Sequence, residues 1–294
     1  MSQYTAESPS FNPFDEIPAA KPYRPSDMTY NDYLKVPELL QLQELKSEPP
    51  HHDEMLFIVI HQAYELWFKL ILHEMEKAIG LMQRQQVLAA RHFLHRVGEV
   101  MKLLVTQIHI LETMTPADFL QFRDRLEPAS GFQSVQFREV EFVMGLKDTR
   151  YLRMFNNRPD LRAVLERRLA EPDLRSAYYG LLREMGLALP DDVTIEGLEE
   201  NAAAQGQLLS ALATIYQNPT EHLPLYVLSE SLVDLDEYVN LWRYHHVRVV
   251  ERIIGHKIGT GGSTGIGYLQ KTTTKRCFPY LWRVRTELVK EAYS

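Results

Sequence analysis

The sequence has very little cysteine, since Cys277 is the only one among 294 residues. One thiol cannot form an intrachain disulfide. It also cannot supply a Cys-x-x-Cys-His haem attachment or an all-cysteine zinc or iron–sulfur site. Low cysteine content is typical of a reducing compartment, so we expect a cytoplasmic location. Any metal-bearing group must therefore be held by other side chains.

An excess of positive charge is also missing. The chain has 32 Lys and Arg against 39 Asp and Glu, a net charge of −7. Such a chain has no basic field for nucleic acid or an anionic membrane. The N-terminus lacks the charged and apolar segments of a signal peptide. The apolar run over residues 55–72 is interrupted by polar and charged residues, which favours a buried core helix over a membrane span. We expect neither nucleic acid nor a membrane as a partner.

Alternating runs of β-branched residues, the usual sign of strands, are not found, so the sequence predicts an all-α protein. Length alone favours about two domains, but helical proteins of this size often form one core. We therefore predict a single helical bundle over residues 1–294. Residues 1–27 contain five prolines and little periodicity, which indicates an extended N-terminal arm lying on another surface.

Helical periodicity covers most of the remaining chain. A strict apolar heptad predicts a helix over residues 90–111. Thr115, Pro116 and Asp118 have the pattern of an N-cap, a first-turn proline and a capping-box acid. We expect the helix that they open to continue to Pro128. The other predicted helices are a short one opened by Pro37 and those over residues 55–79, 134–147, 160–170, 173–186, 195–217 and 223–255.

The last of these long helices carries a histidine on its buried face. Apolar residues from Leu228 to Ile253 repeat at alternating spacings of four and three, and His246 falls on this stripe. An unpartnered buried imidazole costs about 1–3 kcal/mol, so His246 must be hydrogen-bonded or bound to a ligand. A bonded carbonyl and a metal-bearing cofactor both remain open. A porphyrin suits the second alternative, because it supplies the remaining iron ligands itself.

A second histidine, His61, lies in the predicted helix over residues 55–79. Phe57 and Tyr64 lie on the same helical face. Glu65 and Lys69 continue the polar stripe, and an ion pair between them beside a hydrogen-bonded histidine is one explanation. That explanation does not account for the aromatic rings around the imidazole, so we interpret His61 as a candidate site residue.

Arg123 and a glycine-rich loop are two further candidates. Arg123 follows Phe119 by one helical turn, and either a surface ion pair or a fork for a ligand carboxylate would explain it. The loop over residues 259–265 lacks the Gly-Lys-Ser/Thr ending of a phosphate loop and follows a helix. We interpret it as a flexible lid whose glycines permit close approach to a ligand.

Seven segments form an ordered set of motifs between residues 29 and 265, and an eighth lies beyond them. They are Thr29-Tyr-x-x-Tyr33-Leu, His52-Asp-Glu-Met-Leu-Phe57-Ile, His61-Gln-x-x-Glu65-Leu-Trp-Phe-Lys69, Phe122-Arg123, Pro128-Ala-Ser-Gly-Phe-Gln-Ser134, Trp242-Arg-Tyr-x-His246, Gly259-Thr-Gly-Gly-Ser-Thr-Gly265 and Phe278-Pro-x-Leu-Trp282. Together they resemble the tryptophan 2,3-dioxygenase family, haem enzymes that open the indole ring. Two small departures are a lid that reads Ser-Thr-Gly instead of Ser-Ser-Gly, and Phe119 where some members carry tyrosine.

The resemblance implies a mainly helical homotetramer with one haem b per subunit. Such an enzyme uses O2 to cleave the C2–C3 bond of L-tryptophan to N-formyl-L-kynurenine, the first step of the kynurenine pathway. By motif position, His246 would be the iron ligand, with Ser130 and Trp242 beside the haem. The residues expected around the substrate are Phe57, His61, Phe119, Arg123 as the carboxylate clamp, Thr260 in the lid, and Tyr30 and Tyr33 from the neighbouring subunit.

The proposed role of His61 follows from the weak acidity of the indole N–H. A histidine with an ordinary pKa of about 6.5 is too weak a base to deprotonate an indole N–H outright. We therefore expect His61 to orient the substrate and accept its hydrogen bond. Two other functions stay open: a haem oxygenase of the same superfamily acting on another indole or aromatic amine, and a cofactor-free helical interaction protein. Arg123 argues against the first, since a substrate without a carboxylate would not need it.

Overall fold

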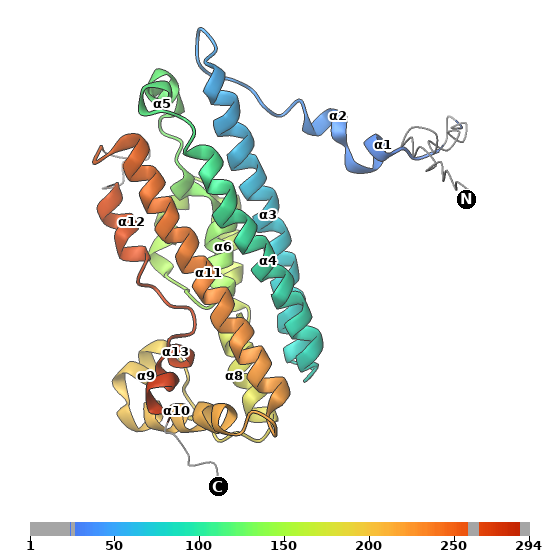
Figure 1. The fold of residues 1–294 in the computed structure, drawn as a ribbon, viewed down its shortest axis with the longest axis vertical. Coiled ribbons are helices and arrows are strands. Elements are labelled where there is room, and N and C mark those ends of the chain that lie inside the picture. Colours follow the sequence, from blue (N-terminus) through green and yellow to red (C-terminus); the bar gives the residue numbers. More distant parts are fainter. Residues whose placement is uncertain (1–23, 25–26, 258–264, 289–294) are drawn as a thin grey trace, which may run out of the picture. The chain divides into compact units, whose positions relative to one another are not determined.

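The computed structural model describes residue 24, residues 27–257 and residues 265–288. The chain divides into two units, Met1–Glu44 and Leu45–Ser294, and each is described by itself. Every regular element in the described ranges is an α-helix or a 3-10 helix (Figure 1), so the predicted all-α class is confirmed. Apart from residues 24 and 27, the predicted arm over residues 1–27 lies outside the described residues, and its extended form stays a prediction.

In the first unit, two short helices follow one another. Helix α1 (Tyr30–Leu34) begins after Thr29, whose side chain forms a capping box with Asp32. Helix α2 (Val36–Leu39) has Pro37 in its first turn, as the sequence predicts.

The second unit is built around three long helices. They are α3 (His52–Met82), α4 (Val87–Leu111) and α11 (Leu223–Ile254), with α4 packed against both others (Figure 1). The heptad predicted for residues 90–111 is confirmed, because all of its positions are buried. Leu94 and Leu104 of α4 lie in the same hydrophobic core as Met75 of α3 and Leu228 of α11. These helices form the frame on which the site residues are held.

Helix α3 is the one described helix that is long and apolar enough to cross a membrane on length and composition alone. It packs against α4, α6 (Val135–Val143) and α8 (Leu174–Glu184), and Ile71, Leu72 and Met75 are buried in the core. One face of α3 therefore belongs to the core, while 28% of its most apolar 18-residue stretch is buried within the chain.

After α4 the chain forms a short α-helix and two 3-10 helices before α6 begins. Helix α5 (Pro116–Phe122) begins with the predicted capping box of Thr115 and Asp118. It ends earlier than predicted, since the chain tightens into the 3-10 helix η1 (Arg123–Leu126). A second 3-10 helix, η2 (Gly131–Gln133), leads into α6. Helix α6 stops at Val143 rather than near residue 147, because Gly145 adopts a positive φ of 101°.

The remaining helices lie beyond α6. The helix predicted over residues 195–217 is divided at Asn201, whose side chain accepts hydrogen bonds from the amides of Ala203 and Ala204 and so caps a new helix. The elements are η3 (Thr149–Phe155), α7 (Pro159–Ala170), α9 (Ile195–Glu200), α10 (Ala202–Gln217), α12 (Ile266–Thr272) and α13 (Pro279–Glu287). In Figure 1, α9, α10 and α13 gather at one end of α11, and α12 lies beside its other end.

Candidate active site

A large cavity lies among α3, α5, α6, α11 and α12. It contains about 1520 Å³ of unfilled space, part of which is open to solvent. Most of its wall is apolar, with side chains such as Ile108, Leu111, Val249 and Ile253. The structure brings seven of the predicted site residues to this wall, although they come from positions 57 to 246. They are Phe57, His61, Phe119, Arg123, Ser130, Trp242 and His246.

His246 lies on α11 at the cavity wall, one turn beyond Trp242. The imidazole and the indole are stacked with nearly parallel planes, inclined by 2°, and their ring centroids lie 5.3 Å apart. Burial, together with charge repulsion from the nearby His61 and Arg138, lowers the pKa of His246 from 6.5 to about 4. The ring is therefore neutral at pH 7, so one of its nitrogens has a lone pair for a metal ion.

His61 lies on α3 at the same cavity. Its Nδ1 is 2.7 Å from the carbonyl oxygen of Phe57, and a carbonyl can only accept a hydrogen bond. Nδ1 therefore carries the proton and donates it, and Nε2 keeps a lone pair. Burial lowers the pKa of His61, although the Phe57 carbonyl and the charge of Glu65 act in the opposite direction. The result is a neutral imidazole with a defined tautomer, which can accept a hydrogen bond from a ligand at Nε2.

Aromatic rings fix the wall between α3 and α5. The ring of Phe57 lies 4.1 Å from that of His61, 5.7 Å from Phe119 and 5.8 Å from Phe122, measured between centroids. This cluster packs the C-terminal end of α5 against α3. Arg123, the first residue of η1, follows directly after α5. Arg123 is half-buried and lines the cavity. That location favours the carboxylate fork over the exposed surface pair as its explanation.

Glu65 binds a residue of another helix, whereas the sequence suggested an ion pair with Lys69 on its own helix. Its carboxylate accepts a hydrogen bond of 2.8 Å from Gln136 Nε2, and the same amide group donates to the Glu65 carbonyl oxygen. Gln136 belongs to α6, so these bonds join two walls of the cavity. Lys69 is exposed.

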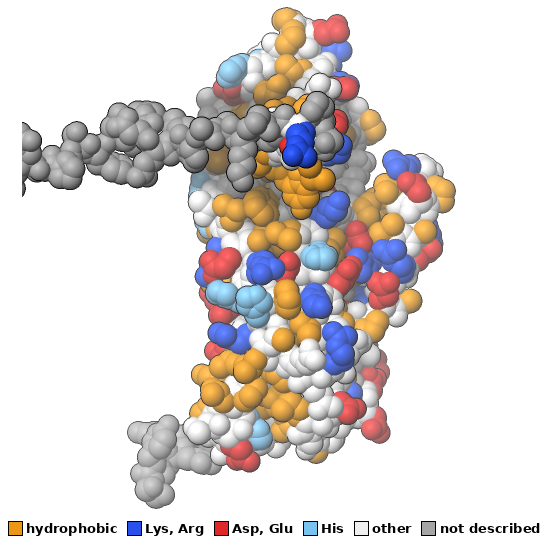
Figure 2. Space-filling model, turned by 90° about the vertical axis from the view of Figure 1, so that its right-hand side faces the viewer, with side chains coloured by type: hydrophobic (Ala, Val, Ile, Leu, Met, Phe, Trp, Pro, Cys, Tyr) orange, Lys and Arg blue, Asp and Glu red, His pale blue; other side chains and the backbone are white. Residues whose placement is uncertain are grey.

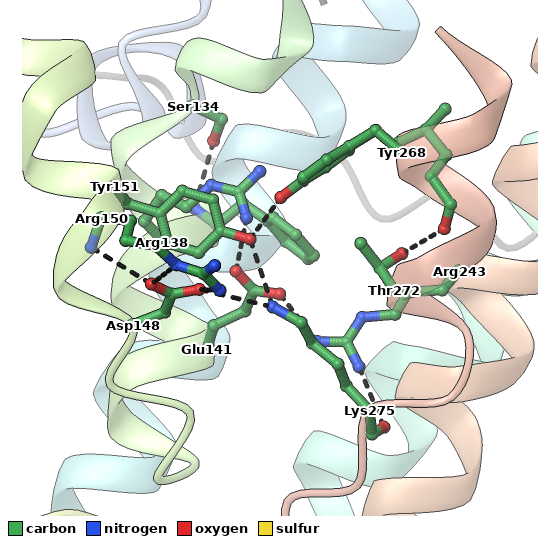
Figure 3. A network of polar contacts seen from close by, with 12 residues as sticks. Ser134, Arg138, Glu141, Asp148, Arg150, Tyr151, Arg243, Tyr268, Thr272 and Lys275 are labelled. Carbon is green, nitrogen blue, oxygen red and sulfur yellow. Dashed lines mark hydrogen bonds and ion pairs between the residues drawn. The ribbon is translucent and has the colours of Figure 1, made fainter. Parts of the chain in front are cut away.

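A buried network of charged residues at the cavity was not foreseen from the sequence. Glu141 of α6 lies between two guanidinium groups, those of Arg138 and Arg243, and accepts from both (Figure 3). The bond from Arg243 Nη2 is 2.7 Å long. Two signals were present in the sequence: Arg138 and Glu141 are three apart on one helix, and Arg243 lies within the motif that contains His246.

Tyrosines and a lysine extend this network. Arg138 lies over the ring of Tyr151 at 4.1 Å, and the hydroxyl groups of Tyr151 and Tyr268 are 2.5 Å apart. Lys275 donates to Tyr151 and lies 3.8 Å from Asp148 (Figure 3). These contacts tie η3 to α6 and α12, and α6 and α12 both line the cavity.

Three predicted site residues lie in the first unit or outside the described residues. Tyr30 and Tyr33 lie on α1 in the first unit, and both side chains are exposed. Thr260 lies outside the described residues, as does the predicted lid except for Gly265. The roles expected for these residues stay predictions.

The fold and the cavity together define a class of protein. It is an all-helical protein that encloses an apolar site with two neutral imidazoles and an arginine among aromatic side chains. The model of the family described as tryptophan 2,3-dioxygenase matches residues 18–192 and 195–288. The chain belongs to the tryptophan 2,3-dioxygenase family.

Individual relatives agree with this assignment. A tryptophan 2,3-dioxygenase from Nocardioides sp. is 45% identical over 268 residues, covering 90% of this chain and 96% of its own. One from Caulobacter vibrioides is 44% identical over 262 residues, covering 89% and 99% of the two chains. One from Myxococcus xanthus is 42% identical over 260 residues, covering 88% and 89%. The similarity therefore extends over nearly the whole length of both partners.

Proposed function

We propose that this protein uses O2 to cleave the C2–C3 bond of L-tryptophan, giving N-formyl-L-kynurenine at the start of the kynurenine pathway. Both oxygen atoms enter the product. The observation that carries the proposal is the convergence of His61, Arg123 and His246 on one apolar cavity in a chain of this family. Each part of tryptophan then has a chemically matched neighbour: an acceptor for the indole N–H, a cation for the carboxylate and aromatic walls for the ring.

Haem b, one per subunit, is the proposed cofactor. The donor set fits it, because His246 is a neutral imidazole at the wall of a large apolar cavity and a porphyrin needs only axial ligands from the protein. No group of three or more His, Cys, Asp or Glu that could hold a metal ion is found among the described residues. His246 would bind the iron, and Ser130 and Trp242 would lie beside the macrocycle. When bound, haem supplies the iron chemistry that activates O2.

The protein's own side chains bind and orient the substrate. Nε2 of His61 accepts the hydrogen bond of the indole N–H, since Nδ1 is already bonded to the Phe57 carbonyl. Arg123 binds the carboxylate by charge-assisted hydrogen bonds. Phe57 and Phe119 cover the indole and exclude water, which strengthens both polar contacts. Thr260, Tyr30 and Tyr33, the last two from a neighbouring subunit, would complete the site.

A homotetramer in the cytoplasm is the proposed state of the protein. Exposed apolar side chains on α3 and α4 support assembly: Leu66 is 54% exposed and Ile110 is 50% exposed. Figure 2 shows hydrophobic side chains gathered among charged and histidine side chains on one face. The net charge of −7 gives no support to nucleic acid or an anionic membrane as a partner.

Single-turnover product analysis with ¹⁸O-labelled O2 and tryptophan tests the proposal. We expect a Soret band in the purified protein and N-formylkynurenine carrying two labelled atoms. A product with one labelled atom would instead identify a monooxygenase of the same superfamily. A protein without a Soret band after reconstitution with haem would be the cofactor-free interaction protein.

A further inference from the structure

Helix α5 must be held in place by its neighbours. It has seven residues, and helices this short are not stable by themselves in water. It lies beside the N-terminal end of α3 (Figure 1) and packs against both α3 and α11. Arg123 follows its last residue directly, so the position of α5 determines where the Arg123 side chain lies.

Two faces of α5 have different neighbours. Phe119 and Arg123, four residues apart, line the cavity. Asp118 and Phe122 are also four residues apart, and neither of them lines the cavity. Both approach His51, the residue that precedes α3: His51 Nε2 lies 4.0 Å from Asp118 Oδ1, and the ring centroids of His51 and Phe122 are 5.8 Å apart. Helix α5 therefore lies between the cavity and His51.

His51 is fixed to the start of α3. Its backbone amide donates to Ser47 Oγ at 2.8 Å, and its Nδ1 accepts from the Asp53 amide at 3.3 Å as the N-cap of α3. Because Nδ1 accepts, the proton of the neutral ring is on Nε2, the nitrogen that faces Asp118. Asp118 uses its other oxygen, Oδ2, in the capping box with Thr115.

We infer that His51 is a positioning residue for the substrate: it holds α5 against the start of α3, so that Arg123 is directed at the tryptophan carboxylate. This inference rests on the proposed function. The ring of His51 contacts Phe122, which directly precedes Arg123, and its Nε2 faces Asp118 one turn earlier. Without these contacts, α5 is held less tightly and Arg123 is placed less precisely. A small displacement of a binding group is enough to weaken its bond to a ligand.

His51→Asn separates the cap of α3 from the contact with α5. Asparagine is a good N-cap, but it has no ring to contact Phe122. Calorimetric titration of the anaerobic holoenzyme should show about three- to tenfold weaker binding of L-tryptophan. Tryptamine has no carboxylate, and its affinity should change by less than about twofold. His51→Ser, a second capping variant, should behave in the same way.

A double variant tests whether His51 acts through Arg123. In the Arg123→Leu background, His51→Asn should cause no further loss of tryptophan affinity, because the group that it positions is already absent. A residue that only stabilised the fold of the site would weaken binding in both backgrounds.

His222→Asn is the matched control. His222 is likewise the residue that precedes a long helix, α11, and it does not line the cavity. Its affinities for tryptophan and tryptamine should equal those of the wild type. Far-UV circular dichroism and haem content verify that each variant is folded and loaded.

Three results would overturn the inference. Equal weakening of tryptophan and tryptamine binding by His51→Asn would show a general role in the fold of the site. Unchanged tryptophan affinity would show that α5 is held without His51. A further loss in the double variant would show that His51 does not act through Arg123. If Arg123→Leu itself leaves tryptophan binding unchanged, the carboxylate clamp of the proposed function fails, which separates the two failures.

Discussion

At the scale of single residues, the environment of each imidazole determines what it can do. His61 and His246 have the same side chain, and burial lowers the pKa of both, so both are neutral at pH 7. They differ in their contacts. His61 donates Nδ1–H to a backbone carbonyl, whereas His246 stacks on an indole. The first arrangement prepares a hydrogen-bond acceptor, and the second presents a ligand to a cofactor.

His246→Ala should lose haem, because the proposed iron would have no protein ligand on that side. The measurement is the ratio of haem to protein after purification. His245→Ala is a suitable control, since His245 does not line the cavity. A His246→Ala protein with full haem content and an unchanged visible spectrum would refute the ligand assignment.

Arg123→Leu should raise KM for tryptophan and lower kcat/KM by about tenfold or more, while haem is retained. The reason is the loss of a charge-assisted bond, which contributes about 1.5–3 kcal/mol in a site that excludes water. Arg125→Leu, at an exposed position of the same 3-10 helix, should change little. Equal KM values in the two variants would exclude the carboxylate clamp.

His61→Ser should reduce turnover without abolishing it, because a serine hydroxyl can still accept a hydrogen bond but positions the indole less well. Haem content and tryptophan binding should be largely retained. Steady-state kinetics and a tryptophan titration decide between the alternatives. Background activity with normal tryptophan binding would point to His61 as an obligatory base.

At the scale of elements, buried carboxylates on the long helices bind the backbone amides of neighbouring segments and so fix their relative positions. Glu54 is an example at the start of α3: its carboxylate accepts bonds from the amides of Lys46 and Ser47 and from the Ser47 hydroxyl, at 2.5–3.0 Å. Asp236 does the same on α11, where it accepts from the amides of Cys277 and Phe278 and from Trp282 Nε1. Such carboxylates connect long helices to segments that would otherwise have unsatisfied amides.

Glu54→Gln should lower the free energy of unfolding at pH 7 by about 1–3 kcal/mol. Burial raises the pKa of the Glu54 carboxyl, but the hydrogen bonds from Ser47 and Lys46 outweigh it, so its pKa lies below the usual 4.5. Because the folded pKa is depressed, the stabilisation is complete above about pH 4.5 and is lost as the pH falls through the folded pKa.

Denaturant unfolding of the wild-type protein and Glu54→Gln between pH 7 and pH 3 measures this effect. The difference between them should shrink at the acid end of the series. Glu237→Gln, an exposed site on α11, serves as control and should match the wild type throughout. A difference that stays constant with pH would mean that the charge of Glu54 contributes nothing.

At the scale of the whole molecule, the proposed site extends beyond one chain. Tyr30 and Tyr33 are three residues apart on α1, and their large side chains are exposed. Apolar side chains on α3 and α4 are exposed as well. Burial of such side chains between subunits is a common basis of closed symmetric assembly.

Deleting residues 1–34 should raise KM for tryptophan and weaken the oligomer together. The physical reason is that a proline-rich arm cannot form a core of its own and must be stabilised by another surface. Sedimentation analysis and steady-state kinetics on the truncated protein measure both effects. A full-length protein that is monomeric and fully active would contradict shared sites.

The amino-acid sequence by itself predicted the long helices, and seven of its predicted site residues line the cavity. The spacing of apolar residues predicted the buried heptad positions of α4 and the apolar stripe of α11 that contains His246. The capping pattern of Thr115 and Asp118 predicted the start of α5. These features are local, since periodicity and capping depend on residues within a few turns. The helix break at Asn201 was missed because a capping side chain in a polar segment competes with helix continuation only weakly.

The tertiary structure alone decided which charges are buried together. Arg138 and Glu141 could have formed an exposed pair on one helix, and Arg243 could have faced solvent. The packing of α6 against α3 and of α12 against α11 surrounds all three groups and places them at the cavity. It also directs the Glu65 carboxylate to Gln136 on another helix. Long-range electrostatic neighbours depend on how helices pack, and residue spacing along one helix does not determine that packing.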